Sequence, residues 1–203
     1  VGHVGSLIRE YAGLWGFRVV CCDPPREERE HCGFLPLEEV AREADLLTFH
    51  TPLDTTTRHM AGEELFARLK PGAVVMNSSR GEVVDGDALL RSGHPCVLDV
   101  WEHEPHLDPP LLATPHVAGY SEQGKATATA MSVATLAGFF GLPLRGWYPS
   151  EAAPSVPRPI PWQELCTTIG DAYDIEAESC RLKARPADFE AMRDHYRYRR
   201  EYF

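Results

Sequence analysis

Three residues of different chemical types follow one another beyond the ends of predicted strands. Arg80 stands in N-S-S-R-G, Glu104 in D-V-W-E-H-E-P and His116 in T-P-H-V-A-G-Y. An arginine fork can bind a carboxylate through two parallel hydrogen bonds, and a neutral imidazole can take a proton from an alcohol. A glutamate beside that imidazole would fix its tautomer and favour its charged form. We therefore treat these three residues as candidate catalytic groups.

Each of the three also has an ordinary structural explanation. Arg80 could make a surface ion pair, and Glu104 and His116 could be loop residues without a chemical role. Their order along the chain, together with a glycine-containing segment at its start, favours the catalytic interpretation. Histidines flank Glu104, but W-E-H-E-P-H differs from the H-E-x-x-H helix of zinc hydrolases, and Pro105 would interrupt such a helix. We expect no metal site there.

The chain starts with a segment that resembles the end of a dinucleotide-binding loop. Gly2 and Gly5, separated by His3 and Val4, match the second and third glycines of G-x-G-x-x-G. Gly2 would let the backbone approach a pyrophosphate, and Gly5 would let the following helix pack closely on the sheet. Asp23 ends the next predicted strand, where a carboxylate can accept hydrogen bonds from ribose hydroxyls. Its charge would repel a 2′-phosphate, which favours NAD over NADP; capping of a turn before two prolines is the alternative role.

The first glycine of this motif would precede residue 1. We therefore expect the 203 residues to be a fragment that lacks the first strand and the segment before it.

The elements that position these residues alternate along the chain. Apolar runs predict strands at 17–22, 45–50, 73–77 and 96–100, separated by helical patterns after Gly5 and at 37–44, 63–69 and 85–91. Strands that are apolar throughout indicate a parallel sheet covered by helices on both faces. Ligands bind beyond the carboxyl ends of such strands, which is where Asp23, Thr51, Arg80 and Glu104 fall.

The second part of the chain changes in composition. Residues 121–142 read as one long helix, and the proline-rich stretch 146–161 reads as a linker between a domain at 1–145 and a tail at 162–203. The tail is too short to bury a core alone, so it should pack on a partner chain or on the main domain. Its last run, 193–203, mixes Arg with Tyr; this could suit RNA stacking, but in so acidic a chain it favours an amphipathic interface helix.

The overall composition excludes several classes of protein. The chain has 43% hydrophobic residues and a formal net charge of −10, which supports a folded core and argues against a nucleic-acid-binding surface. Its six cysteines contain no C-x-x-C pair, which favours reduced thiols in a cytoplasmic protein. No run is long enough to span a membrane, and no signal peptide is visible.

The chain resembles the D-isomer-specific 2-hydroxyacid dehydrogenases, in which a catalytic Arg, Glu and His occur in this order and in these contexts. The resemblance covers nearly the whole chain, and it is carried by these segments: 22–26, 45–53, 97–105, 116–126, Tyr173-Asp174 and 196–201. It implies a Rossmann-type doubly wound parallel α/β sheet, a Pro-rich arm, a C-terminal dimerisation segment, and a separate N-terminal substrate lobe absent from this fragment.

The resemblance also implies roles for individual residues. Arg80, Glu104 and His116 would be catalytic. Asp23 and Thr51 would contact the adenosine half of NAD, with Gly2, His3, Val4 and Gly5 at its phosphates. Asp99 and Gly119 would lie near the nicotinamide. Arg80 and Tyr120 would contact the substrate, a small phosphorylated 2-hydroxy acid of four carbons. The tail would make the protein a homodimer.

Other interpretations remain open on the sequence. A related dehydrogenase acting on glycerate, 3-phosphoglycerate or lactate would share the same three catalytic residues. A non-catalytic NAD-sensing module with this fold would recruit partners with little turnover. A degenerate or purely structural fragment is the third alternative.

Overall fold

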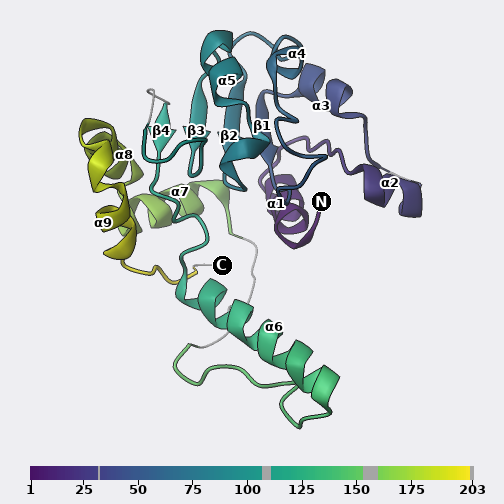
Figure 1. Ribbon diagram of the computed structural model, residues 1–203, viewed down its shortest axis with the longest axis vertical. Coiled ribbons are helices and arrows are strands. Elements are labelled where there is room, and N and C mark those ends of the chain that lie inside the picture. Colours follow the sequence, from purple (N-terminus) through teal and green to yellow (C-terminus); the bar gives the residue numbers. More distant parts are fainter. Residues whose placement is uncertain (32, 107–110, 153–159, 202–203) are drawn as a thin grey trace. The chain divides into compact units, whose positions relative to one another are not determined.

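The computed structural model describes residues 1–31, 33–106, 111–152 and 160–201 (Figure 1). These residues form two compact units. The first comprises Val1–His116 and Asp174–Arg193, and the second Val117–Tyr173 and Asp194–Phe203. Part of the predicted linker, residues 153–159, and the end of the predicted tail lie outside the described residues.

The first unit is built on a four-stranded parallel sheet of order β1-β2-β3-β4 (Figure 1). Its strands are β1 (Leu46–Phe49), β2 (Val74–Asn77), β3 (Cys96–Leu98) and β4 (Leu112–Ala113). The sheet confirms the parallel arrangement and the three strands predicted at 45–50, 73–77 and 96–100. Strand β4 was not predicted, because a two-residue strand is too short to show a hydrophobic period.

Helices precede β1 and separate β1 from β2 and β2 from β3, as the alternating pattern predicts. The first unit contains α1 (His3–Leu14), α2 (Pro24–Glu30), α3 (Leu37–Glu43), α4 (Glu63–Phe66), α5 (Gly86–Ser92), α8 (Ile175–Ala184) and α9 (Phe189–Asp194). Two short 3₁₀ helices, η1 (Gly81–Val83) and η2 (Pro186–Asp188), complete it. Aspartates start α2, α5 and α8, where each carboxylate accepts a main-chain N–H of the first turn.

The prediction of a strand at 17–22 is wrong. This segment is neither helix nor strand, although the Leu35 N–H donates to the carbonyl of Cys21 over 2.8 Å. Apolar and β-branched residues indicate that a segment suits a buried strand, but a strand forms only where a neighbour completes its ladder. The described ladders join β1 to β4, and none of them reaches residues 17–22.

The tail contributes to the core of the first unit. Leu182 of α8 and Phe189 of α9 are almost fully buried in the same cluster as Val75 of β2 and Phe66 of α4. The ring of Phe189 meets Trp101 edge to face at 5.4 Å, and the Ala113 N–H of β4 donates to the Ser179 hydroxyl over 3.0 Å. Of the two packing partners expected for the tail, residues 174–193 therefore use the main domain.

The second unit contains α6 (Glu122–Phe140) and α7 (Trp162–Ala172). Helix α6 confirms the long helix predicted at 121–142; Ser121 caps its first turn, and it ends at Gly141 in the left-handed conformation. The interface helix expected at 193–203 is wrong. Helix α9 ends at Asp194, residues 196–201 contain no helix, and Arg199 forms a parallel bridge with Ser121 instead.

The following statements on membrane spans, metal ligands and cysteines concern the described residues alone. Among them, no helix is long and apolar enough to cross a membrane, and no group of three metal-ligating side chains is gathered at one place. The cysteines other than Cys32, which lies outside the described residues, are free thiols.

Gly81 joins two loops of the first unit. A Cβ atom at this position would overlap the carbonyl oxygen of Trp101 and lie 2.5 Å from its carbonyl carbon. Only a residue without a side chain allows the segment after β2 to lie against the backbone of Trp101 and Glu102, which follows β3. This close approach brings the loop of Arg80 to the loop of Glu104.

We predict that Gly81→Ala lowers the free energy of unfolding by about 1–3 kcal/mol, because both neighbouring atoms belong to rigid backbone. Urea denaturation measures the change. Gly86→Ala is the matched control, since its Cβ would stand 3.7 Å from the Glu102 carboxylate, an ordinary contact. Equal stability of the two variants would contradict the close packing.

Candidate active site and cofactor site

Glu104 and His116 form the centre of the candidate active site. The Glu104 Oε2 atom lies 3.6 Å from His116 Nδ1, a distance for an ion pair that is longer than a hydrogen bond. The other carboxylate oxygen, Oε1, accepts the Trp101 N–H over 3.3 Å. The sequence predicted this pairing of carboxylate and imidazole, and the structure brings the two groups together. Nδ1 faces the carboxylate, so Nε2 is the atom left to exchange a proton with a ligand.

The main chain holds His116 in a conformation that few residues adopt. His116 has a φ of 58°, in the left-handed region that is sparsely populated by residues other than glycine. Its N–H donates to the carbonyl of Asp99 over 3.0 Å and also lies 2.9 Å from the carbonyl of Thr114. The Thr114 hydroxyl donates to the Asp99 carboxylate over 2.6 Å. Asp99, expected near the nicotinamide, is therefore also the residue to which the His116 loop is bonded.

Burial shapes the electrostatics of Glu104. Loss of hydration raises the pKa of this carboxyl group above its ordinary value, and the negative charge of Asp99 adds to the rise. The Trp101 N–H and His116 act in the opposite direction without reversing it. The carboxylate is thus held in a place where its charge is costly, and a positive charge on His116 would relieve that cost.

Arg80 lies on a loop that Asn77 fixes. Asn77 is fully buried at the end of β2; its Oδ1 accepts the N–H (3.0 Å) and the hydroxyl (2.8 Å) of Ser79, while its amide donates to the Arg80 carbonyl over 2.8 Å. The Arg80 side chain is exposed, and its guanidinium donates to the Ser79 carbonyl over 2.6 Å. No described contact joins it to Glu104 or His116. Sequence reasoning did not assign Asn77 a role, and the only signal was a polar residue ending an apolar strand.

Glu102 is a second residue that sequence reasoning missed. Its carboxylate faces His59 Nε2 at 2.7 Å and accepts the Gly86 N–H over 3.1 Å. Although partial burial alone would raise the pKa of Glu102, these contacts hold it below its ordinary value. The residue ties the loop after β3 to the start of α5, next to the close approach of Gly81.

The residues predicted to bind the phosphates of the cofactor lie at the start of α1. Helix α1 begins directly after Gly2, as the motif predicts, and Gly5 is buried, with its Cβ position 3.6 Å from the Cβ of His50. A Cβ at Gly2 would meet no atom within 4 Å, whereas His3 and Val4 are exposed. The open space at Gly2 therefore leaves room for a ligand against the helix N-terminus, where main-chain N–H groups and the helix dipole attract anions.

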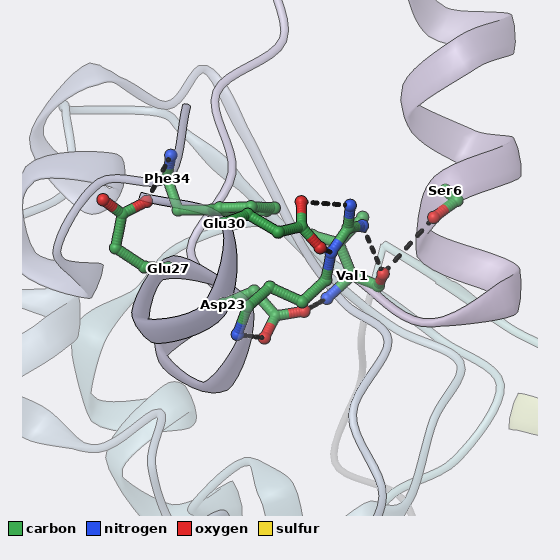
Figure 2. Close-up of polar contacts among 7 residues, drawn as sticks. Val1, Ser6, Asp23, Glu27, Glu30 and Phe34 are labelled. Atoms are coloured by element: carbon green, nitrogen blue, oxygen red, sulfur yellow. Dashed lines mark hydrogen bonds and ion pairs between the residues drawn. The ribbon is translucent and has the colours of Figure 1, made fainter. Parts of the chain in front are cut away.

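Asp23 lies beside this helix start (Figure 2). One carboxylate oxygen pairs with the α-amino group of Val1, and the other accepts the Arg26 N–H over 3.0 Å. Although burial by itself would raise the pKa of Asp23, these two partners hold it below its ordinary value. Asp23 therefore caps the start of α2, which is the alternative role that the sequence suggested for it. A shallow depression of about 570 Å³ adjoins it, lined by Val1, Gly2, His3, Ser6, Arg26 and Arg29 among others.

Thr51 has a buried hydroxyl without a hydrogen-bond partner in the described part of the chain. A buried polar atom left in this state costs free energy, so it marks a place where a ligand can supply the missing bond. The neighbouring His50 is also partly buried; loss of hydration, followed by the charge of the Val1 amino group, lowers its pKa and disfavours the charged ring. The orphaned hydroxyl, the open glycine and the helix N-terminus fit a dinucleotide.

Gly119 and Tyr120 belong to the second unit. Gly119 is exposed, and a Cβ there would meet no atom within 4 Å. Tyr120 is partly buried between aromatic rings, and the Lys125 ammonium lies 3.9 Å from its ring centre. The structure describes these residues within their own unit, and their predicted contacts with nicotinamide and substrate stay predictions.

Comparison with known proteins identifies the family. The family profile for the NAD binding domain of D-isomer specific 2-hydroxyacid dehydrogenases matches residues 1–120. The chain belongs to this family. The first unit thus holds an NAD-binding domain, and NAD is its cofactor. The glycine loop, the parallel sheet and the loop ending in His116 all lie within the matched residues.

Curated relatives extend the similarity to the tail. The chain is 41% identical over 222 aligned residues to an erythronate-4-phosphate dehydrogenase of Bacteroides fragilis, covering 99% of the chain and 62% of the relative. It is 38% identical to a protein of the same name from Cronobacter sakazakii, covering 100% of the chain and 60% of the relative. The chain therefore spans about three fifths of the length of these relatives.

Solved structures show the same fold. A D-lactate dehydrogenase from Aquifex aeolicus, complexed with NAD and lactic acid, aligns with a TM-score of 0.57 and 26% identity over 69% of this chain and 51% of that one. A D-lactate dehydrogenase with NAD⁺ from Lactobacillus jensenii aligns with a TM-score of 0.58 and 26% identity, over 74% and 53% of the two chains.

We predict that Thr51→Val leaves the free energy of unfolding unchanged or slightly higher, because its hydroxyl has no hydrogen bond to lose. NAD binding should weaken about 3- to 10-fold, the value of one hydrogen bond. Thermal denaturation with and without NAD measures both effects. Thr57→Val is the contrast: its hydroxyl donates to the Pro52 carbonyl over 2.7 Å, so this variant should lose stability. Unchanged NAD affinity in Thr51→Val would remove Thr51 from the cofactor site.

We predict that Glu104→Gln raises the free energy of unfolding at pH 7. Because the pKa of Glu104 is raised in the folded protein, the protonated carboxyl group stabilises the fold below the ordinary glutamate range. This stabilisation is lost as the pH rises through the folded-state pKa. The advantage of the glutamine variant should therefore shrink towards zero as the pH falls to about 4. Urea denaturation over this pH range measures it, with the exposed Glu64→Gln as control. A variant less stable than wild type at pH 7 would show that the carboxylate stabilises the fold.

Proposed function

We propose that the intact protein oxidises 4-phospho-D-erythronate at C2 to 2-oxo-3-hydroxy-4-phosphobutanoate, with NAD as hydride acceptor, in the synthesis of pyridoxal 5′-phosphate. The observation that carries this proposal is the identity of about 40% to erythronate-4-phosphate dehydrogenases over essentially the whole chain, tail included. D-lactate dehydrogenases share the fold, but their structural alignments with this protein cover only about seven tenths of the chain at 26% identity.

His116 would act as the base of this reaction. C2 loses its hydrogen with the electron pair, the hydroxyl oxygen loses its proton to His116 Nε2, and a C=O bond forms. When bound, NAD supplies the acceptor for the hydride. Glu104, 3.6 Å from Nδ1, would stabilise the imidazolium that results, and its costly buried charge makes this pairing stronger than it would be in water.

Other residues would bind and orient. Arg80 would bind the substrate carboxylate with its planar fork, and Tyr120 would contact the substrate. Asp23 and Thr51 would contact the adenosine half of NAD, Gly2 to Gly5 its phosphates, and Asp99 and Gly119 its nicotinamide end. The open space at Gly2 and the orphaned Thr51 hydroxyl support the cofactor assignments.

We propose that the intact protein contains a nucleotide-binding domain, a linker and a C-terminal segment. The 1–145 domain would be a doubly wound Rossmann-type domain, joined by the 146–161 linker to a dimerisation segment at 162–203, in a cytoplasmic homodimer. Exposed apolar side chains on α6, among them Met131, Leu136 and Phe139, offer a surface for association.

We predict that the intact gene product reduces NAD in the presence of 4-phospho-D-erythronate, and that His116→Asn lowers kcat about 10²- to 10⁴-fold, the contribution of a positioned base. Arg80→Lys should mainly raise KM for the hydroxy acid, since an ammonium cannot form two parallel hydrogen bonds. NADH absorbance measures turnover, and a sizing column on the same preparation tests the dimer.

Substrate profiling decides between the dehydrogenases of this family. D-Lactate, D-glycerate and 3-phosphoglycerate should be turned over far less efficiently than 4-phospho-D-erythronate. Preference for one of these three would replace the proposed substrate. Binding of NAD without turnover of any of the four would favour a sensing module over an enzyme.

A further inference from the structure

The C-terminal segment of the second unit is paired with the loop that follows His116 in the chain. The Glu122 N–H donates to the Arg199 carbonyl over 2.9 Å, and the Glu201 N–H donates to Gln123 Oε1 over 3.0 Å. The Ser121 hydroxyl donates to the Glu201 carboxylate over 2.8 Å. Residues about 80 positions apart in the sequence are therefore joined by backbone and side-chain bonds.

The guanidinium of Arg199 donates hydrogen bonds to several carbonyl groups of this loop. Its Nη2 donates to the Ala118 carbonyl over 2.7 Å, and its Nη1 lies 3.2 Å from the Tyr120 carbonyl and 3.4 Å from that of Val117. The same Nη1 is 2.9 Å from the Tyr196 hydroxyl. A planar fork with five N–H donors can serve several acceptors at once, whereas a lysine ammonium is a point charge.

Main-chain hydrogen bonds within the loop act beside the Arg199 contacts. The Tyr120 N–H donates to the Val117 carbonyl over 2.8 Å, and the Ser121 N–H lies 3.2 Å from the Gly119 carbonyl. Ala118 and Gly119 are exposed. Without Arg199, the carbonyl groups of Ala118 and Tyr120 would lose the donors described here, and a short exposed loop containing glycine would gain conformational freedom.

Aromatic packing extends the same support to the Tyr120 side chain. Its ring lies edge to face with those of Tyr198 (5.5 Å) and Tyr196 (6.1 Å), both from the C-terminal segment. The Lys125 ammonium lies on the Tyr120 ring at 3.9 Å and 5.6 Å from that of Tyr198. Backbone and side chain of Tyr120 are thus both held by residues 196–201 or by the first turn of α6.

We propose that Arg199 is a positioning residue, which holds the 117–121 loop so that Gly119 and Tyr120 meet cofactor and substrate. This inference rests on the proposed function, in which these two residues are ligand contacts. It assigns the Arg- and Tyr-rich end of the chain to the support of the active site. The neighbouring Arg200 makes an exposed ion pair with Glu122 (3.0 Å), of a kind that contributes little.

The test compares Arg199→Ala with Arg197→Ala in the intact gene product. Arg197 is exposed, belongs to the same segment and carries the same charge, so its removal controls for net charge. Hydrogen exchange followed by mass spectrometry should show faster exchange over residues 117–124 in Arg199→Ala alone. The kcat for 4-phospho-D-erythronate should fall about 10- to 100-fold, the cost of a misplaced contact, with an unchanged pH profile because His116 stays in place.

Two further variants separate positioning from unfolding. Arg199→Lys should recover only part of the lost kcat, and added methylguanidinium should raise the kcat of Arg199→Ala but not that of Arg197→Ala. Unchanged exchange, or unchanged kcat in Arg199→Ala beside an active wild type, would overturn the inference while leaving the proposed function intact. A wild-type protein that turns over no hydroxy acid would overturn the proposed function itself, and exchange over 117–124 would still report whether Arg199 holds the loop.

Discussion

The main chain of Asp99 is the connection on which the candidate active site depends. Its N–H donates to the Asn77 carbonyl of β2 over 2.9 Å, and its carbonyl accepts the His116 N–H over 3.0 Å. Main-chain hydrogen bonding therefore continues beyond the last strand residues and reaches the backbone of His116. Since Asn77 also anchors the loop of Arg80, a single line of hydrogen bonds sets the starting points of all three candidate catalytic loops.

Two features of the first unit are unfavourable for its stability but suit the proposed function. Burial raises the pKa of Glu104 and leaves the Thr51 hydroxyl without a partner, and both are unfavourable in the free protein. Each cost can be offset by an event of the proposed reaction: protonation of His116 for Glu104, and binding of NAD for Thr51. Local conflicts of this kind are expected where a fold has been shaped to bind and react.

Two parts of the tail have different structural roles. Residues 174–193 complete the core of the first unit through Leu182 and Phe189, while residues 196–201 support the 117–121 loop of the second. The similarity to the curated relatives also extends through the tail, beyond the NAD-binding domain. The segment is too short to fold alone, so its hydrophobic and hydrogen-bonding groups are used by neighbours within the chain.

The sequence alone determined the elements with strong periodic patterns and the residues that could do chemistry. Strands β1 to β3 followed from apolar runs, the long helix α6 from its helical spacing, and the pairing of Glu104 with His116 from the chemistry of a carboxylate beside an imidazole. The two wrong predictions of secondary structure have one cause: a local sequence pattern does not specify which other segment it will pair with. Residues 17–22 suit a strand but have no neighbouring strand among the described residues, and the run at 193–203 pairs with Ser121 and Glu122 instead of forming a helix. Only the tertiary structure revealed the need for glycine at position 81, the role of Asn77 and the fork of Arg199, since each depends on backbone atoms brought together from distant parts of the chain.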